Sequence, residues 1–164
     1  MATITSYIDV VPLATAKTYL RIDTGITESD SEITILINSA CELIEQYTQI
    51  FLKPQPKTFY FNTNNEARVY AYPINSITAP ANADDYKVTV KQLYSVYEPN
   101  DADLKSITAY IGHTDTDNVK QIFVYAVLET VKLWYYGGES ESVMKGYIPS
   151  SVMNVLSQER RFIF

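Results

Sequence analysis

The chain contains a single cysteine and a single histidine, and these scarcities exclude several classes of protein. One cysteine cannot build a disulfide framework, and one cysteine with one histidine cannot supply a zinc site of the usual kind. Only five glycines occur, and none has the spacing of a phosphate-binding loop, a dinucleotide-binding fingerprint or a Gly-x-Ser-x-Gly nucleophile elbow. We therefore expect no cofactor and no bound metal.

Positive charge and long apolar runs are also scarce. Thirteen Lys and Arg residues stand against 19 Asp and Glu, and the net charge of -6 disfavours a nonspecific grip on nucleic-acid phosphates. The most apolar run, residues 122–136, is interrupted by Glu129, Thr130 and Lys132 and falls short of the roughly 18 apolar residues of a membrane span. Residues 1–6 lack the basic and apolar parts of a signal peptide. We expect no membrane contact. We also expect the protein to be made and used in a reducing cytoplasm, or in an assembly built there.

Aromatic residues are what the chain has in excess, at 13% with 14 tyrosines. Tyrosine joins a large apolar ring to a polar tip, which suits half-buried strands and wet interfaces. Half-buried strand aromatics are the favoured interpretation of those between residues 57 and 113, with a protein interface second and stacking on sugars or bases third. They are Tyr60, Tyr70, Tyr72, Tyr86, Tyr94, Tyr97 and Tyr110.

Helical spacing dominates the first third of the chain. Pro12 followed by an apolar stripe predicts a short helix over residues 12–20. A longer helix is predicted over residues 30–48, opened by a capping box of Ser29 and Glu32, with Asn38, Glu42, Glu45 and Gln46 mostly away from its apolar face. The apolar face consists of Ile33, Leu36, Ile37, Ala40, Cys41, Ile44 and Tyr47.

Residues 57–113 change to short β-branched and aromatic runs separated by turn residues, which predicts strands. The six runs are residues 58–61, 68–72, 76–78, 86–90, 92–97 and 106–111. We expect a small antiparallel sheet or a barrel-like insertion, whose pairing the sequence leaves open.

Helical patterns return after residue 115. A helix over about residues 118–136, capped by Asp115 or Asp117, is apolar around nearly its whole circumference, which predicts a central place in a bundle with Trp134 in its middle. Gly137 and Gly138 end it. A last short helix starts at Ile148-Pro149, with Val152, Val155 and Leu156 on one face.

The fold class expected is α+β within a single domain, residues 1–164. A mainly α-helical bundle comprises about residues 12–52 and 115–160, and an antiparallel β insertion comprises about residues 57–113. A tail, residues 160–164, follows the last helix.

Candidates for chemistry are few. Cys41 with His113 as its base is one, but Cys41 belongs to an apolar helix face, where we expect burial, and His113 reads as a surface turn residue. The acids Asp23, Glu28, Asp30 and Glu32 lack the spacing of a calcium loop, and the helix dipole accounts for acids near a helix start. Carboxylates paired across space for glycoside chemistry stay open.

The order of segments resembles a known family. The run Leu13-Ala-Thr-Ala-Lys-Thr-Tyr-Leu-Arg-Ile-Asp leads into Glu32-Ile-Thr-Ile-Leu-Ile-Asn-Ser-Ala-Cys-Glu-Leu-Ile-Glu-Gln-Tyr-Thr. Tyr110-Ile-Gly, Leu133-Trp-Tyr-Tyr and the closing residues 148–160 follow in order. This resembles the head–tail connector proteins of tailed bacteriophages, also called head-completion or DNA-packaging adaptor proteins, over nearly the whole chain. The β segment is longer than the family's usual one, and the family's proline before the long helix is absent near Asn118.

The resemblance implies a structural virion protein rather than an enzyme. It implies a homo-oligomeric ring, commonly of twelve copies, below the portal in the neck between capsid and tail, assembled in the host cytoplasm. The ring extends the DNA channel, DNA passes through it without specific binding, and the partners are the portal and tail or neck proteins. Two alternatives stay open: another neck or tail-completion protein, such as a stopper or tail adaptor, and a carbohydrate-binding or enzymatic domain that uses the β region.

The tail combines two cations with three large apolar side chains: Arg160, Arg161, Phe162, Ile163 and Phe164. One interpretation folds it back on its own bundle. The other places it in the portal, because members of the resembled family often dock by their C-terminal segments, and Arg pairs bidentately while Phe fills interface pockets. We predict portal docking by these five residues.

Overall fold

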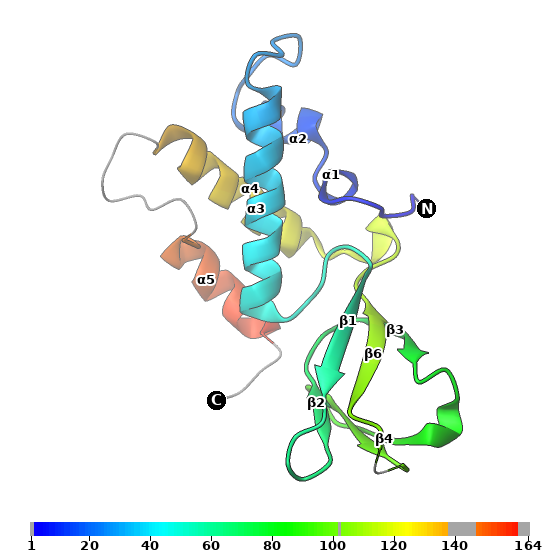
Figure 1. Ribbon diagram of the computed structural model, residues 1–164. Helices are drawn as coiled ribbons and strands as arrows, with labels where there is room; N and C mark the ends of the chain where they lie inside the picture. Colours follow the sequence, from blue (N-terminus) through cyan, green and yellow to red (C-terminus); the bar gives the residue numbers. More distant parts are fainter. Residues whose placement is uncertain (1, 102, 138–146, 161–164) are drawn as a thin grey trace.

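The protein has an α+β fold in which a helical part and a β part lie end to end (Figure 1). The computed structural model describes all residues except 1, 102, 138–146 and 161–164. The helices are α1 Tyr7–Val10, α2 Leu13–Tyr19, α3 Asp30–Thr48, α4 Gln121–Tyr136 and α5 Ser150–Leu156. The strands are β1 Gln55–Tyr60, β2 Ala67–Val69, β3 Ile74–Ala79, β4 Tyr86–Val90, β5 Ser95–Pro99 and β6 Ser106–Ile111. Short 3-10 turns occur at Ala83–Asp85, Thr116–Asn118 and Ser157–Glu159.

The long helix α3 begins and ends where its apolar spacing predicts, and its apolar face is buried. Its capping box is not formed. Ser29 has φ -96° and ψ 2° and makes no side-chain cap hydrogen bond, because an N-cap residue of that kind needs an extended backbone. The Ser29 hydroxyl instead accepts a hydrogen bond from the Tyr135 hydroxyl at 3.2 Å, which ties the start of α3 to the end of α4.

The helical core forms mainly between α3 and α4, with α1, α2 and α5 packed around them. One face of α4, including Phe123, Val127 and Trp134, is buried. The opposite face is exposed at Tyr125 and Tyr136. The expected central position of α4 is therefore wrong in part, because the described residues leave the opposite face of α4 uncovered.

The last two helices, α4 and α5, also differ from the prediction, α4 in where it begins and α5 in one side chain of its apolar face. Asn118 belongs to the 3-10 turn Thr116–Asn118, which Asp115 caps by accepting the Asp117 amide at 3.0 Å. The long helix therefore starts three residues later, at Gln121. In α5 the Val155 side chain is exposed, while Val152 and Leu156 are buried.

All six predicted runs form strands, and they make two three-stranded antiparallel sheets. One has the order β1-β6-β3 and the other β2-β5-β4. In the first sheet β1 and β6 pair from Gln55 opposite Ile111 to Tyr60 opposite Ser106. A second core includes residues from both sheets: Phe51, Ala67, Val69, Ala71, Tyr97, Ile107, Ala109 and Ile111.

The chain returns from the β part to the helical part at a tight crossing. Gly112 has φ +107°, and a Cβ there would lie 2.0 Å from the Lys53 carbonyl oxygen, so only glycine fits. The next residue, His113, donates its amide to the Phe51 carbonyl at 3.0 Å and packs edge-on against Tyr72. His113 is buried, so the expected surface position is wrong, and burial lowers the pKa of its imidazole. The crossing thus directs the His113 imidazole toward Tyr72.

Cys41 lies in the helical core with no exposed surface, as its place on the apolar face predicts. Burial raises the pKa of its thiol, which keeps the unreactive protonated form. We expect the native protein to resist a thiol reagent and the unfolded protein to react within minutes. Mass spectrometry of labelled protein, with and without denaturant, measures this difference. Rapid labelling of the native protein would contradict the buried position.

None of the described helices combines the length and the apolar character needed to cross a membrane.

Candidate interaction surfaces

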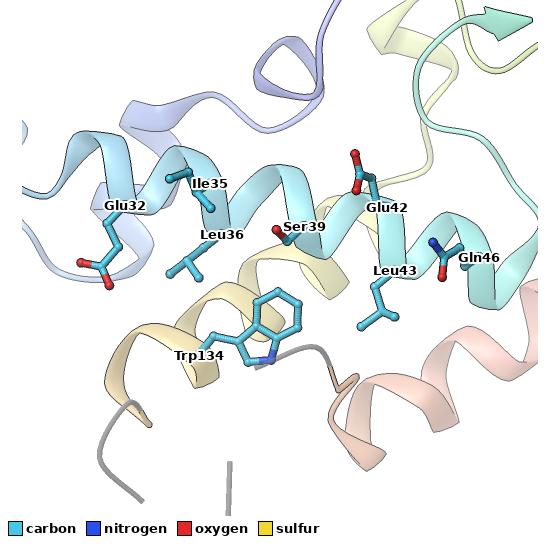
Figure 2. Close-up of a pocket in the computed structure, with 8 residues that line it drawn as sticks. All are labelled: Glu32, Ile35, Leu36, Ser39, Glu42, Leu43, Gln46 and Trp134. Carbon is cyan, nitrogen blue, oxygen red and sulfur yellow. The ribbon is translucent and has the colours of Figure 1, made fainter. Parts of the chain in front are cut away.

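A groove of about 610 Å³ runs along the exposed side of α3, and we call it the α3 groove (Figure 2). Figure 2 shows the Leu36 and Leu43 side chains pointing toward Trp134 of α4, so these three residues form an apolar floor. Glu32 lies at one end of the row and Glu42 nearer the other. The lining residues are Glu32, Ile35, Leu36, Ser39, Glu42, Leu43, Gln46 and Trp134.

The α3 groove has the composition of a binding surface. Ile35 is 63% exposed beside the floor, although large apolar residues on a helix are ordinarily placed toward the core. Among the residues that the structure describes, the lining includes two carboxylates and no lysine or arginine. A segment with an apolar side and positive charge would complement it.

A second surface is the outer edge of the β2-β5-β4 sheet, where β4 is the last strand. Val88 is 42% and Val90 77% exposed, and the lysines Lys87 and Lys91 are also exposed. We call residues 87–91 the β4 edge. A sheet edge of this kind presents unpaired backbone groups and is a template for contact with another chain.

The aromatic residues of the β part divide between packing and exposure. Tyr97 is buried, and the rings of Tyr70 and Tyr94 contact each other at a tilt of 37° with centroids 5.1 Å apart. Tyr60 and Tyr110 are exposed. The interpretation as half-buried strand aromatics therefore holds for some of the seven tyrosines, and the exposed ones add to the outer surface of the β part.

Arg160, the last described residue, lies against the helical part. Arg160 follows the 3-10 turn after α5, and its guanidinium lies over the Tyr47 ring, 4.7 Å from the centroid. Next to it, Glu159 pairs with Lys120 at 2.7 Å. Of the five predicted docking residues the structure thus places Arg160, on its own subunit's α3. Arg161, Phe162, Ile163 and Phe164 lie outside the described residues.

The residues considered for chemistry are not brought together. Cys41 is in the helical core, whereas His113 belongs to the junction with the β part. Asp30, one of the acids considered for calcium, forms an ion pair with the buried Lys17 ammonium at 2.7 Å. Across residues 2–101, 103–137 and 147–160, no group of three or more His, Cys, Asp or Glu side chains could hold a metal ion.

Glu45 is a buried, hydrogen-bonded carboxylate that the sequence analysis did not identify, because it assigned Glu45 to the side of the helix away from the apolar face. It is 3% exposed. Its Oε1 accepts the Leu52 amide at 2.7 Å, and its Oε2 accepts the Tyr7 hydroxyl at 2.9 Å and the Gln55 side-chain amide at 3.2 Å. The spacing Ile37, Cys41, Glu45 places it on the buried face, and this signal could have identified it.

These bonds give Glu45 a structural task at the junction. The carboxylate joins α1, α3 and the segment that leads into β1. Burial raises the pKa of the Glu45 carboxyl above its ordinary value, although the hydroxyl and amide donors and the charge of Lys53 favour the ionised form. The Lys53 ammonium itself lies 4.1 Å from the Tyr7 ring centroid.

Comparison with known proteins identifies the fold. No protein-family profile and no curated protein matches the chain. Among solved structures, a chain from the neck of an empty gene transfer agent (GTA) particle, computed with C6 symmetry, matches with a TM-score of 0.69 over 99% of this chain and 96% of that one. A chain from the virion of a native GTA particle matches with a TM-score of 0.72 over the same shares. Both are 15% identical in sequence, so the likeness establishes a shared fold.

Proposed function

We propose that the protein is a structural component of the neck of a phage-like particle, where copies of the chain form a ring. The observation that carries this proposal is the end-to-end match to a chain of a GTA neck, which covers the helical and β parts together. The order of sequence segments that resembles head–tail connectors points to the same location. The fold match and the resemblance in segment order thus both support a neck protein.

The finer proposal places the ring directly below the portal, where it extends the DNA channel and joins capsid to tail. The C6 symmetry of the GTA neck neighbour is compatible with a ring of twelve copies. Each subunit carries a net charge of -6, so repulsion of phosphates favours passage of DNA without specific binding. We propose the portal, other neck or tail proteins and copies of this chain as partners, and no enzymatic activity.

Electron microscopy of assembled particles tests the proposal directly. We expect density for this chain as a closed ring on the axis between portal and tail. A ring one layer further from the capsid would favour the stopper or tail adaptor alternative. Absence of the chain from particles, together with binding to a glycan array or hydrolase turnover, would favour the carbohydrate-related alternative.

The C-terminal tail provides a separate prediction about docking. Deletion of residues 160–164 removes two cations and three apolar side chains from the end of the chain. We expect the deletion variant to keep nearly the melting temperature of the full chain while it loses attachment to portals, because the proposed pairing and pocket contacts disappear. Co-sedimentation with portal rings measures attachment, and calorimetry measures stability.

Arg160 needs a matched control, because it already lies on Tyr47. A variant that ends at Arg160 keeps this contact and removes Arg161 to Phe164 only. We expect it to lose portal attachment as the longer deletion does. Normal decoration of portals by either variant would contradict docking by the tail, and a melting temperature many degrees lower would assign the tail to the subunit's own core.

A further inference from the structure

Burial decreases across the β2-β5-β4 sheet toward β4. One row of paired residues crosses the sheet from Val69 in β2 through Ser95 in β5 to Val90 in β4. Directly paired residues share one face of a sheet, and Val69 belongs to the second core. Val69 is 1% exposed, whereas Val90 is 77% and Val88, on the same face, is 42% exposed. The core-facing side of this sheet therefore continues onto β4, where it is uncovered.

The backbone of β4 is open on its outer side. In an antiparallel pair, alternate residues direct both the amide and the carbonyl toward the partner strand. The Lys91 amide donates to the Tyr94 carbonyl at 2.8 Å, so the odd-numbered residues of β4 bond to β5. The backbone groups of Tyr86, Val88 and Val90 point away from β5. Among the described strands none pairs with that side, since β4 is the last strand of its sheet.

The two ends of β4 carry opposite charges. Asp84 and Asp85 come directly before the strand, and Lys91 comes directly after it. The Asp84 and Lys91 side chains are exposed. A second β4 that runs antiparallel beside the first therefore places its basic end next to the acidic end, and does so at both ends. Charge complementarity thus favours a second copy of this chain as the partner of the β4 edge.

One register uses the whole strand. When Val88 faces Val88 of the second copy, Tyr86 faces Val90 on either side, and these pairs exchange about six backbone hydrogen bonds. Their side chains lie on the core-facing side, so the uncovered valines cover one another. A shift by two residues in either direction places Lys87 directly opposite Lys87 or Lys91 of the second copy. Like charges directly opposite destabilise a strand pair, so the lysines exclude both shifted registers.

We infer that two copies of the chain pair through their β4 edges around a two-fold axis, which joins two three-stranded sheets into one continuous sheet. Figure 1 shows β4 toward the far end of the β part from the helices, where a second copy can approach it. The contact is isologous and closes with two copies, so it is separate from the head-to-tail contacts of a ring and goes beyond the proposed function. In the free protein it covers an apolar edge that otherwise promotes aggregation.

Cysteine cross-linking tests the contact and its register. Two Cα atoms of a hydrogen-bonded antiparallel pair lie about 5.5 Å apart, which fits a disulfide, so Val88→Cys should link to itself across the axis. Val90→Cys is the matched control. It is more exposed, but in this register it lies four residues, or about 13 Å, from its counterpart. The native chain is the second control, because its single cysteine, Cys41, is buried.

The two cysteine variants are oxidised mildly at equal concentration, and covalent dimers are followed on non-reducing gels. We expect Val88→Cys to form them at least about tenfold faster than Val90→Cys, because only the first pair has the separation that a disulfide needs. Exposure alone favours the reverse order, since Val90 is the more accessible residue. Equal rates, or faster linking of Val90→Cys, would show random collisions or another register and would overturn the inference.

A proline substitution tests the backbone bonds. The Val88 amide points away from β5, so Val88→Pro removes a donor from the contact without removing a hydrogen bond of the subunit, and edge strands tolerate such a proline. We expect the native chain to show a concentration-dependent dimer in sedimentation velocity and Val88→Pro to stay monomeric. Val88→Thr is the control, because it keeps the amide and the branched shape, and it should remain a dimer.

Charge reversal tests the complementarity of the strand ends. Lys91→Glu places an acid next to the acidic end of the other copy, so we expect the dimer to dissociate at several-fold higher concentration than in the native chain. Asp85→Lys/Lys91→Glu restores opposite charges at both ends and should restore the dimer. Lys132→Glu is the matched control, because it makes the same change of charge at an exposed lysine of α4.

The results are independent of the proposed neck location. A native chain that stays monomeric at every concentration would overturn the inference, and so would a dimer that persists in Val88→Pro, because the contact would then lie on another surface. If Val88→Pro does not fold, the comparison of Val88→Cys with Val90→Cys still decides. None of these outcomes bears on a ring in the particle, which electron microscopy tests separately.

Discussion

Replacement of Trp134 by alanine is expected to lower the free energy of unfolding by about 3–5 kcal/mol, as large-to-small changes in a core do. Trp134 is 2% exposed, and its indole Nε1 donates a hydrogen bond to the Tyr147 carbonyl at 3.1 Å. The change therefore opens a cavity between α3 and α4 and removes a link to the segment before α5. For a domain of this size we expect the melting temperature to fall by roughly 6–20 °C.

Tyr125→Ala is the matched control, because Tyr125 is an aromatic residue on the exposed face of the same helix. We expect it to change the free energy of unfolding by about 0.5 kcal/mol or less. Denaturant unfolding followed by circular dichroism measures both variants. Equal stability of Trp134→Ala and the native chain would show that Trp134 contributes to the groove as a binding surface and not to the core.

The second large effect is expected at Glu45. Glu45→Ala leaves the Leu52 amide and the Tyr7 hydroxyl without their acceptor in a buried place. Each buried donor left without a partner costs about 1–3 kcal/mol, so we expect a loss of about 3 kcal/mol. Glu42→Ala is the control, because Glu42 is an exposed glutamate on the same helix. Equal melting temperatures of these two variants would contradict the structural task of Glu45.

The pH dependence of stability provides a further test of the Glu45 carboxyl group. Burial raises the pKa of Glu45 in the folded state, so the folded chain holds this proton more tightly than the unfolded chain does. The resulting stabilisation is fully present below the ordinary pKa of glutamate and is lost as the pH rises through the folded pKa. Relative to Glu45→Gln, which has no proton to lose, the native chain should lose stability as the pH rises from the ordinary pKa of glutamate, about 4.3, through the raised pKa of the folded state. A difference that stays constant or grows in favour of the native chain would contradict a raised pKa.

Local patterns predicted the elements of this fold well. The bounds of α3 follow from apolar residues at helical spacing, and all six strands appear where β-branched and aromatic runs occur. The division of the strands into two sheets could not be predicted, because pairing depends on contacts between residues far apart in the chain. The failed capping box at Ser29 has a similar origin, since the contact with Tyr135 joins two distant helices.

The candidate surfaces were less predictable than the elements. The α3 groove exists only where Leu36 and Leu43 of one helix face Trp134 of another, so no spacing within α3 reveals it. His113 looked like a turn residue and is buried because the crossing at Gly112 turns it toward Tyr72. Docking by the tail was predicted from its composition and from the resembled family, and it remains a prediction for all five residues.

The pairing of Gln55 with Ile111 at the base of the β part has a consequence for how this protein can vary. Paired strands lie about 4.7–4.9 Å apart, so the helical part meets residues 55–111 as one short closed loop, whatever their number. Lengthening such a loop costs little, since loop-closure entropy grows only with the logarithm of length. Tyr72 is the exception, because its backbone bonds to Gln49 and Phe51 after α3 and so belongs to the junction. Turns of the β part that lie away from this junction can therefore change in length while the helices keep their path.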